Sequence, residues 1–187
     1  MISVLLSAEN EEITVNKHAI ITGASRGTGY EVAAYFARNG YDLSLIARSE
    51  ENLAQAIKML QSKFPDIDMK GYAVDVSQME AAYDAMKAII SEHTGRVDIL
   101  FNNAGIAEQG TTDMSLSEFA KIQSVNMNGA FAIAKDAAEC MREQRCGYIF
   151  NLASVSGKRA RAHMGGYAAS KFALVGFSQA LFREMLP

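Results

Sequence analysis

The sequence has few of the residues that build disulfide frameworks or metal clusters. Two cysteines, Cys140 and Cys146, cannot by themselves form a disulfide scaffold or a four-ligand zinc site. The three histidines, His18, His93 and His163, are scattered along the chain and indicate no metal cluster. We therefore expect no bound metal, and a reducing cytoplasm as the location.

An excess of positive charge and long apolar runs are also missing. The formal net charge of −3 argues against nucleic-acid binding, which usually needs a clear surplus of Lys and Arg to neutralise phosphates. No run approaches the roughly 18 apolar residues that a membrane-spanning helix requires. The apolar patch at residues 2–6 has no basic residues before it, so it does not match a secretory signal. We expect neither nucleic-acid nor membrane partners.

The remaining composition is typical of one soluble domain. The chain has 187 residues, of which 49% are hydrophobic and 21% charged, enough to bury a sizeable core. Two prolines are present, and no repeat, low-complexity tract or linker divides the chain. We expect an N-terminal extension at residues 1–16 and a single domain over residues 17–187.

Short apolar runs alternate with longer segments of helical periodicity. The runs predict strands that are buried on both faces, at 18–22, 42–47, 69–74, 97–102 and 147–152. Ser49 is the expected N-cap of one intervening helix, and Ser77 with Glu80 matches a capping box at the start of another. The apolar stripe of that second helix is expected to comprise Met79, Tyr83, Met86 and Ile90.

Two longer helices are expected from about Ser115 to about Arg142 and over residues 166–185. Strands that alternate with helices in this way predict an α/β fold, a doubly wound parallel sheet with helices on both faces and right-handed crossovers. Such a Rossmann-type sheet binds ligands outside the carboxyl ends of its strands.

A glycine-rich turn, TGASRGTG at residues 22–29, joins the first strand to the first helix. Glycines there let the backbone approach a pyrophosphate, whose charge lies at the helix N-terminus. Their spacing differs from the G-x-G-x-x-G fingerprint, and the alternative is a tight turn without a ligand. The strand before and the helix after favour a dinucleotide site. Its expected cofactor-binding residues are Gly23, Ser25, Arg26, Gly27, Thr28 and Gly29.

The end of the second strand indicates which dinucleotide is bound. An acidic residue there would bind the ribose 2′-hydroxyl of NAD. This chain has Arg48 instead, and Arg26 lies inside the glycine turn. Two guanidinium groups suit a 2′-phosphate, which predicts a preference for NADP(H); the alternative is two solvated arginines.

Tyr167 and Lys171 are four residues apart and share one face of the last predicted helix. Tyr83 and Lys87 have the same spacing, but Tyr83 belongs to an apolar stripe and is interpreted as structural. Ser154 follows the fifth strand, as Asn103 follows the fourth and Asp75 the third. Parallel strands end at one edge, so these segments are expected to converge on one crevice.

These motifs together resemble the short-chain dehydrogenase/reductases, over about residues 17–186, and among them the NADPH-dependent 3-oxoacyl-carrier-protein reductases. The motifs are TGASRGTG, DV at 75–76, NNAG at 102–105, SVNMNGAF with Asn126, and YAASK at 167–171. The resemblance implies a catalytic set of Ser154, Tyr167, Lys171 and Asn126. It also implies cofactor contacts from Asp75, Val76, Asn103, Ala104, Gly105, Tyr167 and Lys171, and a homo-oligomer formed through helices around 118–142 and 166–185.

The resemblance gives each catalytic residue a role in hydride transfer between nicotinamide and a ketone or secondary alcohol. Tyr167 would act as general acid and base, with its phenolate form favoured by the charge of Lys171. Ser154 would hydrogen-bond the carbonyl oxygen and stabilise its developing charge. Asn126 would position a water that relays protons to Lys171, which would also hold the ribose hydroxyls.

Relatives in this family continue past the helix that bears Tyr and Lys, adding two strands and a segment that covers the substrate. We therefore expect a C-terminally truncated product, or a short variant completed by a partner, in which the fifth strand is an exposed edge. The leading hypothesis is an NADP(H)-dependent reductase, possible substrates including 3-oxoacyl groups. The alternatives are a catalytically silent dinucleotide-binding protein with a sensing or assembly role, and an epimerase or dehydratase.

A basic segment lies between Ser154 and Tyr167. It contains Lys158, Arg159, Arg161 and His163. One interpretation is a solvated loop, and the other is a contact with an anionic substrate or with the phosphate of a carrier protein.

Overall fold

The structure is a computed structural model that describes residues 16–93 and 95–185. Within these residues, five parallel strands form one sheet in the order β3-β2-β1-β4-β5. The strands are β1 His18–Thr22, β2 Asp42–Ala47, β3 Met69–Ala73, β4 Ile99–Asn102 and β5 Tyr148–Asn151. The chain proceeds outward from β1 to β3 and then returns to the other side of β1. The switch point between β1 and β4 is therefore where a ligand crevice is expected.

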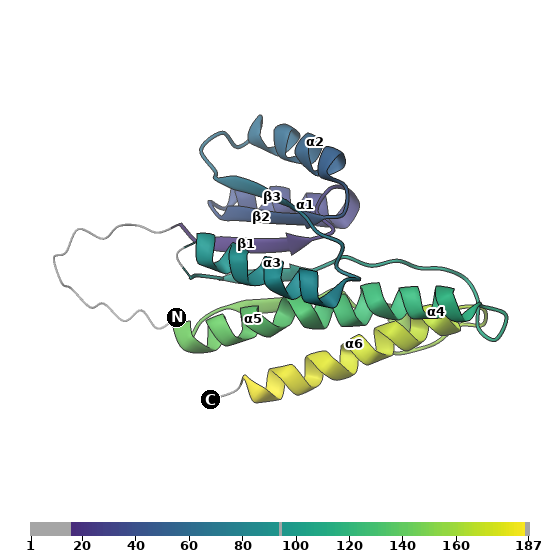
Figure 1. The fold of residues 1–187 in the computed structure, drawn as a ribbon. Helices are drawn as coiled ribbons and strands as arrows, with labels where there is room; N and C mark the ends of the chain where they lie inside the picture. Colours follow the sequence, from purple (N-terminus) through teal and green to yellow (C-terminus); the bar gives the residue numbers. More distant parts are fainter. Residues whose placement is uncertain (1–15, 94, 186–187) are drawn as a thin grey trace.

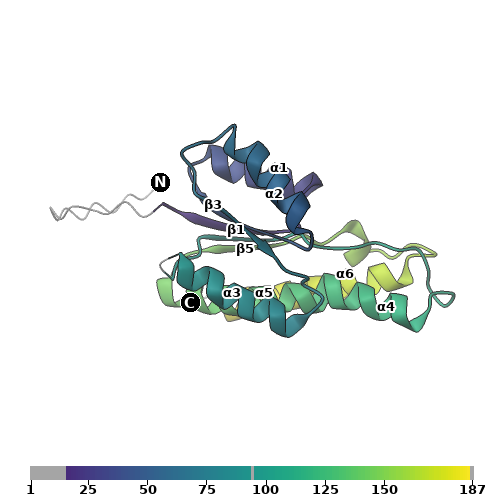
Figure 2. The same cartoon turned by 45° about the horizontal axis from the view of Figure 1, so that its top comes forward.

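Helices cover both faces of the sheet (Figure 1), which confirms the predicted doubly wound fold. Figure 2 shows α1 and α2 on one face and the remaining helices on the other. The helices are α1 Gly27–Arg38, α2 Glu50–Gln61, α3 Met79–Glu92, α4 Leu116–Gln123, α5 Gly129–Gln144 and α6 Gly165–Glu184. No helix in the described part of the chain is long and apolar enough to cross a membrane.

The core consists of two apolar layers, one on each side of the sheet. Ile20 and Ile21 are adjacent in β1 and point to opposite faces, so Ile20 packs beneath α3 and α5 while Ile21 packs beneath α1 and α2. Both side chains are completely buried. Burying a side chain of this size stabilises the fold by about 1.5–3 kcal/mol. The central strand thus holds the two layers, and the crevice at its end, in place.

The outer strands differ from the prediction that all five would be buried on both faces. The inner strands β1, β2 and β4 are mostly buried, whereas most residues of β3 are exposed or half-buried because β3 is an edge strand. On the other edge, Tyr148 and Phe150 of β5 are 66% and 46% exposed. Among residues 16–93 and 95–185, β5 pairs with β4 alone, so the expectation that the fifth strand would form an exposed edge is confirmed for this part of the chain.

The helix starts were predicted with mixed success. Ser49 caps α2 as expected, accepting a hydrogen bond from Asn52 N at 3.2 Å. The capping box predicted at Ser77 is wrong, because the carboxylate of Asp75 binds Ser77 N at 3.0 Å and α3 begins only at Met79. The predicted buried stripe of α3 is also displaced. Its fully buried residues are Ala82, Met86 and Ile89, while Met79, Tyr83 and Ile90 are half-buried.

The long helix predicted from about Ser115 to Arg142 is interrupted. It begins with a capping box between Ser115 and Glu118, but a π-helical turn at Ser124–Asn128 separates α4 from α5. An apolar periodicity near 3.6 residues does not reveal one extra residue in the backbone, so no sequence pattern indicated this turn. The last helix, α6, lies where it was expected.

A buried polar cluster closes the amino-terminal end of β1. His18 is 2% exposed, its ring nitrogens lie 2.8 Å from Arg96 O and 2.9 Å from Ser44 Oγ, and its ring stacks on His93. The carboxylate of Asp98 accepts a hydrogen bond from His18 N at 2.9 Å and pairs with Arg96. Burial lowers the pKa of His18 to about 4 from its ordinary value of 6.5.

Acidification is expected to destabilise the protein through His18. The unfolded chain takes up a proton near pH 6.5 and the folded chain only near pH 4, so the stabilising effect of the neutral ring is complete above pH 6.5 and is lost as the pH falls to 4. The difference corresponds to about 3 kcal/mol in the free energy of unfolding. Urea unfolding at pH 7.5 and pH 5 measures the part that is lost by pH 5, about 2 kcal/mol. His18→Gln should flatten this pH dependence, and an unchanged slope in that variant would contradict the assignment.

Candidate functional site

The glycine turn adopts a backbone that only glycine accommodates easily. Gly23 and Gly27 have φ angles of +65° and +58°, in the left-handed region. A Cβ on Gly29 would collide with the carbonyl oxygen of Gly23. The turn therefore folds tightly onto the start of α1, whose first turn carries no acidic residue and whose N-cap, Arg26, makes no side-chain capping bond. The N–H groups of this helix start can serve an anion.

Hydrogen bonds join this turn to the end of β4. The hydroxyl oxygen of Thr22 accepts bonds from Asn103 N and Ala104 N, each at 2.9 Å. The side-chain amide of Asn103 donates in return to the carbonyl oxygens of Thr22 and Gly23, at 3.0 and 3.2 Å. Thr22 itself is 1% exposed. The carboxyl ends of β1 and β4 are thus fixed to each other at the switch point of the sheet.

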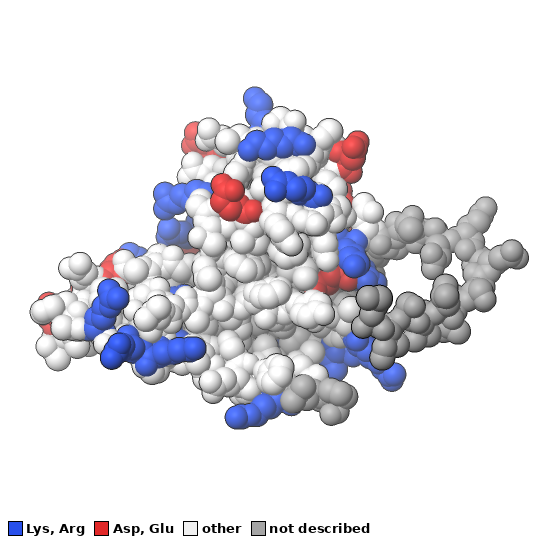
Figure 3. All heavy atoms as spheres, turned by 180° about the vertical axis from the view of Figure 1, so that it is seen from behind, with Lys and Arg blue, Asp and Glu red and all other residues white. Residues whose placement is uncertain are grey.

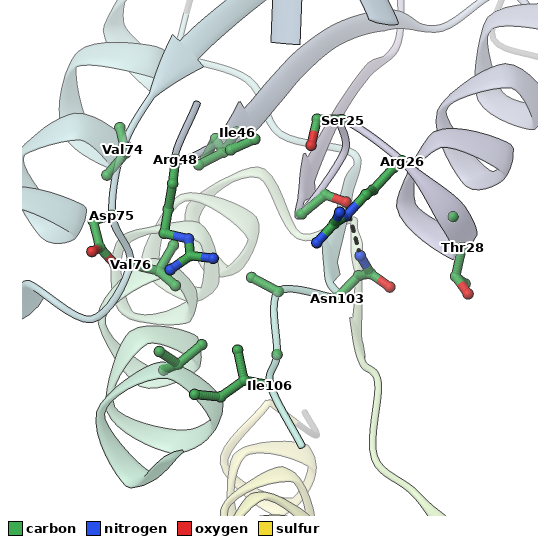
Figure 4. A pocket seen from close by; sticks show the side chains of 16 residues that line it. Ser25, Arg26, Thr28, Ile46, Arg48, Val74, Asp75, Val76, Asn103 and Ile106 are labelled. Atoms are coloured by element: carbon green, nitrogen blue, oxygen red, sulfur yellow. Dashed lines mark hydrogen bonds between the residues drawn. The ribbon is translucent and has the colours of Figure 1, made fainter. Parts of the chain in front are cut away.

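A pocket of about 400 Å³ lies at this edge of the sheet. It brings together most of the predicted cofactor residues, namely Gly23, Ser25, Arg26, Gly27, Thr28, Arg48, Asp75, Val76, Asn103, Ala104 and Gly105. Figure 4 shows the guanidinium groups of Arg26 and Arg48 extending into the pocket from different elements. Gly29 does not line the pocket; it is buried beneath the turn.

The pocket also has an apolar wall that the sequence motifs did not predict. It is formed by Ile46, Ala47, Val74, Ile106 and Val125. Ile46 and Ala47 are the last residues of β2, and Val74 follows β3 directly, so their positions at strand ends were the available signal. A wall of this kind, beside glycine N–H groups and two guanidinium groups, can accommodate a flat ring joined to phosphates.

Asn126 lies in the π-helical turn and is held by three hydrogen bonds. Its amide nitrogen donates to Ile106 O and to Ser170 Oγ, both at 2.9 Å, while its amide oxygen accepts from Ile106 N at 2.8 Å. The hydroxyl of Ser170 donates to Tyr167 O at 2.7 Å. The turn therefore connects the segment after β4 to the part of α6 that carries Tyr167.

Lys171 is almost completely buried, at 4% exposed, and its ammonium group donates to Leu152 O at 2.7 Å. Burial lowers the pKa of Lys171 from its ordinary value because the charged form loses hydration. Its Nζ lies 5.8 Å from the centre of the Tyr167 ring. A Cβ on Gly105 would lie 3.3 Å from the amide oxygen of Asn126 and 3.6 Å from Lys171 Nζ. Gly105 is thus where the pocket meets these two groups.

Ser154 stands at the start of a short 3₁₀ turn, Val155–Gly157, and its hydroxyl accepts a bond from Ser156 N at 3.1 Å. A Cβ on Gly157 would lie 2.7 Å from the carbonyl oxygen of Lys171, so this turn packs directly on α6. Ser154, Tyr167, Lys171 and Asn126 do not line the pocket itself. They come from segments that meet beside it, at the same edge of the sheet.

The second Tyr–Lys pair lies elsewhere. Tyr83 is on α3, half-buried against the core, and its ring centre lies 4.2 Å from Lys87 Nζ and 4.6 Å from Lys135 Nζ. Neither Tyr83 nor Lys87 lines the pocket. The pair forms cation–π contacts on the α3 and α5 surface, which fits the structural interpretation given to Tyr83.

Comparison with known proteins gives a consistent match. The family model described as short chain dehydrogenase matches residues 17–187. A 3alpha-hydroxysteroid dehydrogenase from Mediterraneibacter gnavus is 36% identical, over 91% of this chain and 68% of the relative. An acetoacetyl-CoA reductase from an Acinetobacter strain is 34% identical, over 90% of this chain and 68% of the relative.

Solved structures of the same family also resemble this fold. A metagenomic short-chain oxidoreductase in complex with NADP has a TM-score of 0.84 and 28% identity, covering 90% of this chain and 76% of that one. Among eight curated relatives, the matched part is between 56% and 69% of the length of the relative. This chain therefore spans roughly two thirds or less of those proteins.

Removal of the Thr22 hydroxyl is expected to weaken the joint between β1 and β4. Thr22→Val keeps the shape of the side chain but leaves two backbone N–H groups without their acceptor, at an expected cost of about 1–3 kcal/mol in the free energy of unfolding. Thr22→Ser retains the hydroxyl and is the matched control. Chemical denaturation of the three proteins checks this, and equal stability of the Val and Ser variants would refute it.

Proposed function

The chain belongs to the short-chain dehydrogenases, and from this we propose that it is an NADP(H)-dependent oxidoreductase that interconverts a ketone and a secondary alcohol. The observation that carries the proposal is the junction at Gly105. Gly105 lines the pocket that contains the glycine turn and the two arginines, and it also lies beside Lys171 and Asn126. Lys171 is on α6, the helix that carries Tyr167, and Asn126 is hydrogen-bonded to Ser170 of the same helix. Substrates of the 3-oxoacyl type are included, since an acetoacetyl-CoA reductase is among the relatives.

The residues of the pocket fit a nicotinamide dinucleotide. The N–H groups of the glycine turn and the start of α1 would hold the pyrophosphate, and Arg26 and Arg48 would hold a 2′-phosphate. Val74, Asp75 and Val76 would contact the adenine, and residues 103–105 the adjoining part of the cofactor. When bound, the cofactor supplies or accepts the hydride.

The residues beside the pocket would move the proton that accompanies hydride transfer. In reduction, Tyr167 gives its hydroxyl proton to the carbonyl oxygen, and Ser154 donates a hydrogen bond to that oxygen. The ammonium group of Lys171 stabilises the phenolate that remains. Asn126 is fixed by Ile106 and Ser170, so that its amide oxygen faces the same point as Lys171 Nζ and can hold a water for reprotonation.

We also propose that residues 17–187 act as one domain, with residues 1–16 as an extension, and that the protein works as a homo-oligomer in the cytoplasm. The extension lies outside the described residues except for Asn16. Support for the oligomer comes from large apolar side chains left exposed on α4, α5 and α6, namely Phe119, Phe131, Phe172 and Phe182. Cys140 and Cys146, the two cysteines of the chain, are free thiols, as a reducing compartment would keep them.

Titration of the purified chain with NADPH and NADH, followed by nicotinamide fluorescence, tests the proposal. Ketones and 3-oxoacyl thioesters are then added and the loss of NADPH absorbance is measured. We expect saturable NADPH binding and turnover of at least one ketone. The absence of binding to both cofactors would refute the proposed function.

Tyr167→Phe is expected to lower kcat by roughly 10² to 10⁴-fold, because the variant lacks the proton donor. NADPH affinity should remain close to that of the wild type. Tyr83→Phe is the matched control, since Tyr83 also precedes a lysine by four residues but lies away from the pocket. Steady-state kinetics measure kcat for both variants, and full activity of Tyr167→Phe would contradict the role of Tyr167 as proton donor.

Arg48→Asp is expected to shift cofactor preference toward NADH. The variant replaces a guanidinium group with a carboxylate at the proposed 2′-phosphate site, so NADPH affinity should fall by roughly 10–100-fold while NADH affinity changes little or rises. Arg38→Asp makes the same charge change at an exposed position of α1 that does not line the pocket. Fluorescence titration compares the two variants, and an unchanged ratio of affinities in Arg48→Asp would exclude this role.

A further inference from the structure

A cluster of cations that the proposed mechanism does not use lies between Ser154 and Tyr167. Within residues 158–163, which we call the basic loop, the side chains of Lys158, Arg159 and Arg161 are exposed. The three ion pairs found within the described residues involve none of them. The whole chain has a formal net charge of −3, so this concentration of positive charge is local.

The basic loop is anchored at both ends, to Lys171 of the candidate site at one end and to the segment at residues 110–111 at the other. On one side, Gly157 packs against the backbone of Lys171 in α6. On the other, the carbonyl oxygen of His163 accepts a bond from Gly110 N at 2.7 Å, and Gly165 N donates to Thr111 Oγ1 at 3.1 Å. His163 has a φ angle of +58°, a conformation that residues other than glycine rarely adopt. These contacts fix the position of the basic loop relative to α6 and to residues 110–111.

The charges around the basic loop do not cancel. The acidic side chain of Asp113 interacts electrostatically with His163. Lys158, Arg159 and Arg161 take part in none of the ion pairs found within the described residues. The N-terminus of α6, whose first turn has no acidic residue, adds a positive dipole end beside them. Figure 3 shows Lys and Arg side chains, together with a smaller number of Asp and Glu atoms, on the left of that view, the end of the molecule where α4 and α6 begin.

We propose that the basic loop binds an anionic group, a carboxylate or a phosphate, that is part of the carbonyl substrate. The inference rests on the proposed function and adds to it the class of substrate. The loop joins the turn that begins at Ser154 to the helix whose first turn contains Tyr167, so the three cations belong to the segment that connects the two residues proposed to bind the carbonyl oxygen. Arginine guanidinium groups bind such oxyanions through two parallel hydrogen bonds. Arg26 and Arg48, by contrast, line the cofactor pocket.

Calorimetric titration of the chain saturated with NADP⁺ tests the proposal without requiring turnover. Two matched pairs of ketones distinguish the sources of the anion. The first pair is 4-oxopentanoate and its methyl ester, and the second is acetoacetyl-4′-phosphopantetheine and acetoacetyl-pantetheine. We expect the anionic member of at least one pair to bind about tenfold or more tightly than its neutral partner, with the difference shrinking as the salt concentration rises.

The variant to compare carries Lys158→Gln, Arg159→Gln and Arg161→Gln together. It should lose the preference for the anionic ketone and keep the wild-type affinity for the neutral one and for NADPH. A control variant with Arg38→Gln, Lys58→Gln and Arg183→Gln changes the net charge equally at other exposed positions. It should retain the preference.

Equal binding of both members in both pairs, or equal loss of the preference in both triple variants, would overturn the proposal. Thermal unfolding confirms that the triple variants are folded before they are compared. The NADPH titration keeps the two ideas separate. Failure to bind NADPH would refute the proposed oxidoreductase function, whereas NADPH binding without a preference for anionic ketones would refute the role of the basic loop alone.

Discussion

The hydroxyl group of Thr22 is the contact on which the rest of the site depends. Two parallel strands that run side by side, β1 and β4, end at one edge of the sheet, and their following segments must part in different directions. One oxygen atom accepts the N–H groups of both Asn103 and Ala104, and the Asn103 amide returns two bonds to the glycine turn. These bonds satisfy backbone groups that the sheet no longer pairs. They also hold together the ends of β1 and β4 beside the pocket that the glycine turn and Arg26 line.

From that joint a chain of polar contacts continues to α6. The segment after Ala104 passes Gly105 and reaches Ile106, whose backbone binds both ends of the Asn126 amide. The same amide binds Ser170, next to Lys171, and so fixes the helix that bears Tyr167 relative to the pocket. A regular helix through residues 124–128 would turn Asn126 to a different angle, since the extra residue of a π-helical turn rotates the rest of the helix about its axis. The irregular turn is thus the structural requirement for bringing the two halves of the site together.

The sequence predicted features that depend on local chemistry and missed those that depend on a competing contact. The bounds of β1 and β2 follow from short, mainly apolar runs, and the glycine turn follows from its place between a strand and a helix. The cap at Ser77 was wrong because Asp75, two residues earlier, binds the same backbone N–H that a helix start would leave free. The π-helical turn at residues 124–128 could not be predicted from the sequence, because one added residue changes the apolar periodicity of a helix very little. The positions of Ile46 and Val74 at strand ends were a signal for the apolar wall, but which strand ends border the same pocket follows only from the strand order.

The positively charged side chains near the carboxyl ends of the strands fall into two groups, one in the pocket and one in the basic loop. Arg26 and Arg48 line the pocket on the glycine-turn side, where they suit the phosphate of a cofactor. The basic loop lies between Ser154 and Tyr167 in the sequence, and its cations are too exposed to stabilise the fold appreciably. In a chain with a net negative charge, exposed cations that are gathered in one loop raise the local concentration of anions around that loop. On the proposal that this loop binds the anionic group of the substrate, a substrate whose negative charge lies apart from its carbonyl would be bound in one direction, with the carbonyl toward Tyr167.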